Sequence, residues 1–224
     1  MKEVLGIDFG NTIVHNVKGD KISAGQTGLT EVRDFENAFN CIIRLIDERF
    51  GAENVHLISK VSPTGEARVR EWLRSHDFAI TGFNMDNMHF CRERHEKGPI
   101  CKKLGITHMI DDRPEVMMSC SGIVPFKLLF RPSPQELETF KVQLSNMTGV
   151  TIMNDWWDVE RYFFGSLKKW ENPTLEELVG GSRVEIRIDG KVCLGVSMKK
   201  KIVLHNNAEL LALIDELKAA ATHE

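Results

Sequence analysis

The sequence contains no long uncharged apolar run and no excess of basic residues. Without such a run there is no candidate membrane-spanning segment, and Met1-Lys2-Glu3 leads straight into an apolar segment without the pattern of a signal peptide. A formal net charge of -3 and a pI near 6.3 give no electrostatic footprint for nucleic acid. We therefore expect neither a membrane nor a nucleic-acid partner.

Paired cysteines are also missing, because the five cysteines are odd in number, scattered, and free of any Cys-x-x-Cys pair. This usage is typical of reduced thiols, so we expect a cytoplasmic protein. Internal repeats and low-complexity segments are absent as well. What the chain does contain, 224 residues of which 42% are hydrophobic and 27% charged, is enough for one sizeable domain with an appendage.

Alternating strand and helix signals predict an α/β fold with a mainly parallel sheet that helices cover on both faces. The expected strands are Val4 to Asp8, Val55 to Ser59, Met88 to Cys91, His108 to Asp111 and Val124 to Phe130. Helical spacing of apolar residues predicts helices over Asp34 to Phe50, Glu66 to His76, Pro99 to Leu104 and Pro134 to Met147. A small hairpin of Thr12 to Asn16 and Lys21 to Ala24 is expected as a flap after the first strand.

The character of the sequence changes beyond about Trp157. We predict a core domain over residues 1–165 and a small C-terminal α+β appendage over residues 166–224. Val184 to Ile188 and Val192 to Val196 flank an Asp-Gly turn, which is the strongest hairpin signal in the chain.

Other features of this C-terminal part give weaker predictions. We expect Gly180-Gly181 to be a joint, and the aromatic residues between Trp156 and Phe164 to pack the appendage against the core. The remaining expected elements are a helix over Pro173 to Val179, a strand over Lys201 to Leu204 and a last helix that begins after Asn206.

An apolar strand delivers the carboxylate of Asp8 into the turn Asp8-Phe9-Gly10-Asn11-Thr12. Two phosphate chemistries use such an element. In the first, Asp8 attacks phosphorus and becomes an aspartyl phosphate. In the second, Asp8 organises the metal of an actin-like or sugar-kinase-like ATPase, which also needs a second Gly-rich phosphate loop. Gly180-Gly181-Ser182 is the candidate for that loop.

Three further segments follow the Asp8 turn in a recognisable order. Ser59 ends an apolar strand, Lys97 precedes a short helix, and Ile110-Asp111-Asp112-Arg113-Pro114 ends another strand. Together these four segments make the predicted core domain resemble the haloacid dehalogenase (HAD) superfamily, and in particular a little-characterised capless subfamily with Gly in place of the second Asp of the first motif. The resemblance implies a Rossmann-like three-layer HAD fold.

The resemblance also implies a Mg²⁺-dependent phosphohydrolase that acts through an aspartyl phosphate on a small-molecule or other phosphorylated substrate. Physical chemistry agrees, because carboxylates at the ends of neighbouring parallel strands meet in one crevice and Mg²⁺ prefers oxygen ligands. The implied residues are Asp8, Ser59 and Lys97 for catalysis, Asn11, Thr12, Ser59 and Lys60 for substrate binding, and Asp8, Gly10 through its carbonyl, Asp111 and Asp112 for Mg²⁺.

Gly10 departs from the HAD pattern, in which an Asp two residues after the nucleophile protonates the leaving group and later activates water. Such general acid-base catalysis contributes roughly 10²- to 10⁴-fold in rate, so we expect weakened turnover of substrates with poor leaving groups. His15, Asp112 or a bound water are the candidates to replace the missing carboxylate. The alternative function is a catalytically degenerate HAD-like protein that binds phosphate or another ligand without turnover.

The gaps between the four segments are too short for a cap domain once the core elements are counted. A site without a cap is open, and the resemblance links openness to macromolecular substrates or to closure by another element. We therefore expect the C-terminal appendage either to cover the site or to form a homodimer contact.

Overall fold

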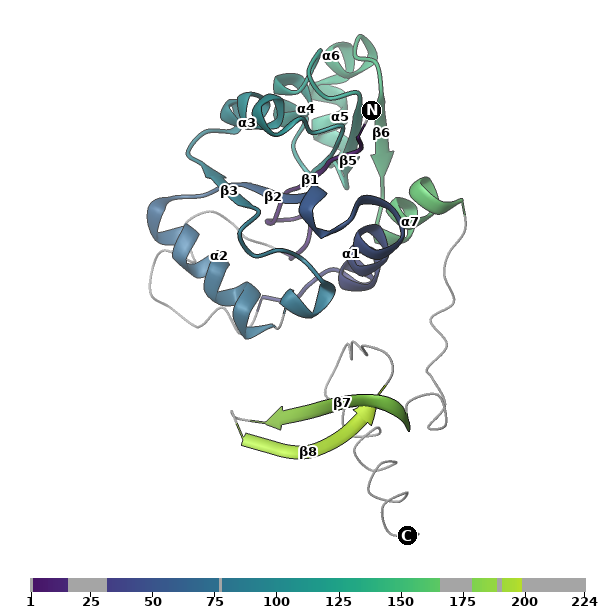
Figure 1. Ribbon diagram of the computed structural model, residues 1–224. Helices are drawn as coiled ribbons and strands as arrows, with labels where there is room; N and C mark the ends of the chain where they lie inside the picture. The colour runs from purple at the N-terminus through teal and green to yellow at the C-terminus, as the bar shows by residue number, and fades with distance from the viewer. Residues whose placement is uncertain (1, 16–31, 77, 166–178, 189–190, 199–224) are drawn as a thin grey trace. The chain divides into compact units, whose positions relative to one another are not determined.

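The structure is a computed structural model that describes residues 2–15, 32–76, 78–165, 179–188 and 191–198 (Figure 1). The chain divides into two compact units, Met1–Leu167 and Lys168–Glu224, and each is described by itself. No helix among the described residues is long and apolar enough to cross a membrane.

A six-stranded sheet forms the centre of the first unit, and all of its strand pairs are parallel. The strand order is β3-β2-β1-β4-β5-β6, so β1 lies in the middle with Ile7 opposite both Leu57 and Ile110. The bounds are β1 Leu5–Ile7, β2 Val55–Lys60, β3 Met88–Cys91, β4 His108–Asp111, β5 Phe126–Phe130 and β6 Val150–Met153. The predicted α/β class with a mainly parallel, Rossmann-like sheet is confirmed.

Helices cover both faces of this sheet, which gives three layers (Figure 1). One face buries a cluster of apolar side chains from α1, α2 and α7, and the other buries a second cluster from α3 and α4. The α-helices are α1 Ala38–Leu45, α2 Pro63–Ser75, α3 Lys97–Leu104, α4 Pro114–Ser119, α5 Pro134–Thr139, α6 Lys141–Ser145 and α7 Trp156–Phe164. Shorter elements are the π-helix η2 Ile46–Phe50 and the 3₁₀-helices η3 Ala52–Asn54, η4 Phe78–Thr81 and η5 Arg94–Glu96.

Two predicted elements of the first unit need correction. The helix expected over Asp34 to Phe50 begins only at Ala38, and its last part is the π-helix η2. The helix expected over Pro134 to Met147 is interrupted at Phe140, which ends α5 and precedes α6.

The aromatic run between Trp156 and Phe164 forms α7 within the first unit. Trp156 and Phe163 are buried in the core of that unit, and Trp156 Nε1 donates a hydrogen bond to the Thr12 carbonyl oxygen at 2.8 Å. These residues of the run therefore contribute to the core of the first unit, and the predicted packing against the C-terminal part involves residues outside the described ranges.

The second unit contains the predicted hairpin, with β7 Val179–Ile188 and β8 Lys191–Met198 paired antiparallel. The expected joint at Gly180-Gly181 is wrong, because both glycines lie within β7, where the register to β8 is irregular between Val179 and Arg183. Four expectations fall wholly or largely outside the described residues: the flap hairpin after the first strand, the helix over Pro173 to Val179, the strand over Lys201 to Leu204 and the last helix.

Candidate functional site

Two carboxylates lie side by side where β1 and β4 end. Asp8 directly follows β1 and Asp111 ends β4, and these strands are parallel neighbours. The Asp8 backbone N–H continues the ladder by donating to the Ile110 carbonyl oxygen at 2.9 Å. Both residues are buried, with exposed fractions of 5% for Asp8 and 1% for Asp111. Asp8 and Asp111 therefore meet at the ends of neighbouring parallel strands, as the direction of the strands predicted.

Lys97 bridges these two carboxylates from the first position of α3. Its Nζ donates to Asp8 Oδ1 at 2.7 Å and to Asp111 Oδ2 at 2.6 Å, and its side chain is only 3% exposed. Burial opposes the charged form of the lysine, but the charges of Asp111 and Asp8 outweigh burial and raise the Lys97 pKa above its usual range. The ammonium is therefore permanently charged at neutral pH.

Gly98 explains how a lysine reaches this depth. A Cβ at Gly98 would lie 2.2 Å from the Ser119 carbonyl oxygen, so α3 approaches the end of α4 closely only because this side chain is missing. Gly98 was not among the residues predicted for the site. The signal that could have identified it is a glycine directly after the lysine at the start of a helix.

Asp112 lies beside the pair, held by the guanidinium of Arg113. Arg113 Nε lies 3.0 Å from Asp112 Oδ2, and Arg113 Nη1 lies 2.8 Å from Glu136 Oε1 at the start of α5. Burial, followed by the charges of Asp8 and Asp111, raises the Asp112 pKa to about 8. Arg113 and Glu136 are further site residues that sequence reasoning missed, since their pairing depends on a contact between distant segments.

The three carboxylates fit a hard cation. Single oxygens from Asp8, Asp111 and Asp112 all lie within 4.8 Å of one another. Burial also raises the Asp111 pKa to about 6, although Lys97 pulls it down. A donor set made of carboxylate oxygens suits Mg²⁺ rather than a softer metal.

The turn after Asp8 is compact and contains the other residues of the first motif. The backbone N–H groups of Ile13 and Val14 both donate to the Phe9 carbonyl oxygen, and Gly10 pairs with Val14 in an isolated bridge. Asn11 has a φ of 56°, a left-handed conformation that asparagine tolerates better than most residues. The turn therefore holds the backbone that follows Asp8 in one fixed shape.

The hydroxyl of Thr12 is the unusual polar group of this turn. Thr12 is fully buried, and among the described residues its Oγ1 has no hydrogen-bond partner. A buried hydroxyl without a partner costs free energy, so an acceptor supplied by a ligand would stabilise it.

Ser59 and Lys60 end β2, the strand next to β1. Ser59 is buried and Lys60 is exposed, and within the described ranges no hydrogen bond joins either side chain to the carboxylate cluster. His15 is exposed and its ring lies against Phe35, with ring centroids 3.7 Å apart. Asp8, Lys97, Asp111 and Asp112 are thus brought together, whereas within the described ranges no hydrogen bond or ion pair joins Ser59, Lys60 or His15 to them.

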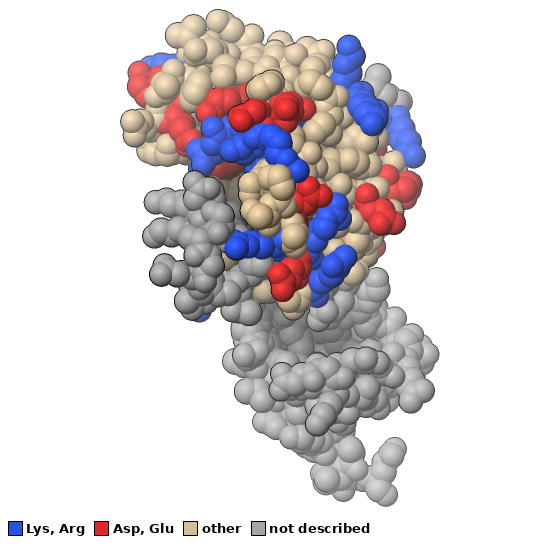
Figure 2. All heavy atoms as spheres, turned by 90° about the vertical axis from the view of Figure 1, so that its left-hand side faces the viewer, with Lys and Arg blue, Asp and Glu red and all other residues tan. Residues whose placement is uncertain are grey.

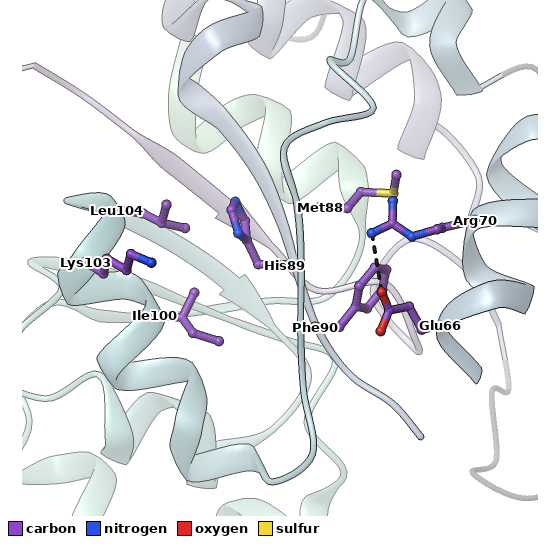
Figure 3. A pocket seen from close by; sticks show the side chains of 8 residues that line it. All are labelled: Glu66, Arg70, Met88, His89, Phe90, Ile100, Lys103 and Leu104. Carbon is purple, nitrogen blue, oxygen red and sulfur yellow. Dashed lines mark hydrogen bonds and ion pairs between the residues drawn. The ribbon is translucent and has the colours of Figure 1, made fainter. Parts of the chain in front are cut away.

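A cavity of about 340 Å³ opens on a different part of the first unit, at the edge strand β3 (Figure 3). Its walls come from α2 on one side of β3 and from α3 on the other, and Arg70 contacts Glu66 within it (Figure 3). Figure 2 turns this edge of the sheet towards the viewer, with basic and acidic side chains interspersed around it. None of the predicted site residues lines this cavity, whose lining is Glu66, Arg70, Met88, His89, Phe90, Ile100, Lys103 and Leu104.

Comparisons with known proteins identify no family for this chain. No family model matches the chain, and no curated protein matches it. Among solved structures, the chain is similar to a de novo designed Rossmann 3x3 fold protein determined by solution NMR. The two are 11% identical with a TM-score of 0.40, and the match covers 77% of this chain and 99% of the designed one. We draw no functional conclusion from that similarity.

Proposed function

We propose that this protein is a Mg²⁺-dependent phosphohydrolase of the HAD type that acts through an aspartyl phosphate on Asp8. The observation that carries the proposal is the buried bridge from Lys97 Nζ to Asp8 Oδ1 and Asp111 Oδ2 at the ends of two adjacent parallel strands. A buried lysine between two carboxylates is costly to assemble, and a site that handles an anionic substrate gives it a use.

The residues divide the work as follows. A carboxylate oxygen of Asp8 attacks the phosphorus, a new bond forms between that oxygen and phosphorus, and the bond to the leaving oxygen breaks. The Lys97 ammonium offsets the charge of the incoming phosphoryl group, which Asp8 would otherwise repel. The free Thr12 hydroxyl and the Ser59 hydroxyl are the side chains assigned to the phosphoryl oxygens.

Asp111, Asp112 and Asp8 are the residues that would hold Mg²⁺, which when bound neutralises phosphoryl charge and orients the group. Asp112 keeps its place through Arg113, which Glu136 fixes in turn. Attack of water on the aspartyl phosphate then returns the Asp8 carboxylate and releases inorganic phosphate.

The experiment that tests this function measures phosphate release from an activated aryl phosphate in the presence of Mg²⁺. Such a substrate has a good leaving group, so the lack of a carboxylate at Gly10 matters least. We expect release by the wild type and its loss, by at least about 10³-fold, in Asp8→Asn, which keeps the shape but removes the nucleophile. Asp86→Asn is the matched control, because Asp86 is exposed and lies outside the site. Equal activity in Asp8→Asn and wild type would contradict the proposal.

Gly10 supports a second candidate, a degenerate HAD-like protein that binds Mg²⁺ and phosphate without turnover. The turn from Phe9 to Val14 contains no carboxylate to take the role of the missing general acid. Mg²⁺-dependent binding of inorganic phosphate without aryl phosphate hydrolysis, together with activity gained in Gly10→Asp, would favour this candidate. The ATPase alternative is less favoured, because Gly180-Gly181-Ser182 lies within the strand β7 rather than in a loop.

A further inference from the structure

Arg131 adopts a backbone conformation that arginine rarely takes. It directly follows β5 and has a φ of 47°, in the left-handed region. Two other described residues besides glycine have a positive φ, and both are asparagines, Asn11 and Asn37, for which this region is less costly. Non-glycine residues persist there at a cost of about 1–3 kcal/mol, commonly at ligand sites. An arginine at this position therefore calls for a use of its side chain.

The guanidinium of Arg131 lies on an aromatic platform that it shares with His15. Its Cζ is 4.9 Å from the ring centroid of Phe35, and the His15 ring lies 3.7 Å from the same centroid. Burial, and then the charge of Arg131, lower the His15 pKa, so the two groups lie within electrostatic range. Phe35 is itself fixed, by an edge-to-face contact with Phe130 and by its backbone N–H, which donates to the Ile13 carbonyl oxygen.

This group of His15, Phe35 and Arg131 lies at the carboxyl end of the strands, where the carboxylate cluster also lies. Arg131 follows the carboxyl end of β5, and Asp8 follows the carboxyl end of β1, with β4 between these two strands. Neighbouring strands are roughly 4.8 Å apart and each residue rises about 3.3 Å. Arg131 lies two residues beyond Leu129, which is level with Asp111, so the backbones of Asp8 and Arg131 are about 12 Å apart. That spacing is on the order of the distance between the two ends of a small phosphorylated metabolite.

The guanidinium of Arg131 has no carboxylate partner within the described ranges, although the charge of Asp34 acts on the neighbouring His15. Arginine presents a planar fork of donors that fits phosphate and carboxylate groups equally well. A guanidinium that lies on an aromatic ring beside an imidazole can therefore bind an anion.

We propose that His15, Phe35 and Arg131 form a second anion subsite, which binds a further phosphate or carboxylate group of the substrate at the same end of the sheet as Asp8. This inference rests on the proposed phosphohydrolase function and narrows its substrate class to phosphomonoesters with a second anionic group. An arginine binds phosphate and carboxylate groups through the same charge and paired hydrogen bonds, so the test uses substrates that distinguish the two groups.

The test compares two pairs of substrates in the presence of Mg²⁺. Fructose 1,6-bisphosphate against fructose 6-phosphate reports a second phosphate, and 6-phosphogluconate against glucose 6-phosphate reports a distal carboxylate. In at least one pair, we expect the compound with the second anionic group to have a KM about tenfold lower, because a hydrogen-bonded ion pair contributes about that much. The pair that shows the preference identifies the second group.

Arg131→Gly is the decisive variant, because glycine accepts the positive φ and so keeps the fold while removing the cation. The KM difference within the preferred pair should disappear in Arg131→Gly and survive in part in Arg131→Lys. Arg74→Ala is the matched control, since Arg74 is an exposed arginine near the end of α2, and it should keep the full difference. No preference in the wild type, or a preference that Arg131→Gly retains, would overturn the subsite.

Failure of the subsite and failure of the proposed function give different results. If aryl phosphate is hydrolysed but neither pair shows a preference, the function stands and the subsite is wrong. If no phosphomonoester is hydrolysed, the function is wrong, and calorimetric titration of the Asp8→Asn protein with each of the same four compounds then decides on the subsite. The subsite is supported if the compound with the second anionic group binds at least about fivefold more tightly than its partner in a pair, and if Arg131→Gly abolishes that difference. Equal binding of the two compounds in both pairs overturns it.

Discussion

At the scale of single residues, Lys97 sets the charge balance of the candidate site. Its ammonium is the buried partner of both Asp8 and Asp111. Lys97→Met would leave the two buried carboxylates without their ammonium partner. We therefore expect the free energy of unfolding to fall by about 3–5 kcal/mol in the absence of divalent cations. Urea unfolding at pH 7 measures this loss.

Lys102→Met is the matched control for that prediction, because Lys102 is exposed on the same helix. The control should change stability by less than about 0.5 kcal/mol. Added Mg²⁺ should also restore more stability to Lys97→Met than to the wild type, since the cation takes over part of the charge compensation. Equal stability of the two variants without metal would show that the bridge does not form in solution.

His108 gives a pH dependence that does not involve Asp8, Asp111 or Asp112. Burial lowers the His108 pKa to about 4, Glu3 opposes this shift and Arg49 adds to it. The ring is stacked on Phe126 with centroids 4.5 Å apart, and its Nε2 is 3.7 Å from Glu3 Oε1. An imidazole in the unfolded chain has a pKa near about 6.5, so protonation favours unfolding.

The His108 contribution should therefore be complete above about pH 6.5 and should be lost as the pH falls through about 4. In urea titrations between these pH values, His108→Gln should lose less stability on acidification than the wild type. His95→Gln, at an exposed histidine, should follow the wild-type curve. Parallel curves for His108→Gln and wild type would refute the assignment.

The sequence predicted the part of the site that follows from strand direction alone. Asp8 and Asp111 converge because each ends a parallel strand, and apolar patterns locate strand ends well. The contacts that hold the neighbours were not predictable, because Arg113 meets Glu136 and Gly98 meets Ser119 only after separate helices have packed. Such pairings depend on tertiary distance, which no local pattern encodes.

At the scale of elements, the close approach of α3 to α4 decides where Lys97 lies. Gly98→Ala would put a methyl group 2.2 Å from a backbone carbonyl oxygen, so the helices must separate. We expect a loss of about 1–3 kcal/mol in the free energy of unfolding and a further loss of aryl phosphatase activity as Lys97 moves from its partners. Urea unfolding and steady-state kinetics measure the two effects.

Gly65→Ala is the matched comparison, because Gly65 also lies in the first turn of a helix, α2. Its added Cβ would meet only side chains, Val61 Cβ at 3.2 Å and Ser62 Oγ at 3.3 Å. The gain in helix propensity, about 1 kcal/mol, then offsets the crowding, so a small change of either sign is expected. Similar losses in both variants would indicate that Gly98 has no special role in packing.

Element boundaries show where tertiary packing overrode local pattern. The aromatic run at α7 was not predicted as a helix, although Asp155 caps it by accepting from the Asp158 backbone N–H and Gly165 ends it. Its aromatic composition pointed to packing, and the hydrogen bond from Trp156 to Thr12 that anchors it comes from the far end of the chain. The strands were predicted more closely, because a buried parallel strand is a short apolar run between polar ends.

At the scale of the whole molecule, the apolar core that the structure describes belongs to the first unit. Among the residues whose burial is described, the members of both apolar clusters lie between Val4 and Phe163. The proposed catalytic residues and the proposed anion subsite also belong to this unit, which ends at Leu167. From the predicted division into residues 1–165 and 166–224 we expect the first part to fold without the second.

A chain shortened to residues 1–167 should therefore fold alone. We expect a single cooperative urea transition whose midpoint stays close to that of the corresponding transition in the full chain, because both core clusters remain complete. The shortened protein should also retain aryl phosphatase activity that Asp8→Asn removes, since none of the assigned residues is lost. Aggregation or a clearly lower midpoint would mean that the C-terminal unit completes the core. A normal midpoint with lost activity would instead show that the site needs the C-terminal unit. This result would agree with the expectation that the appendage covers the open site.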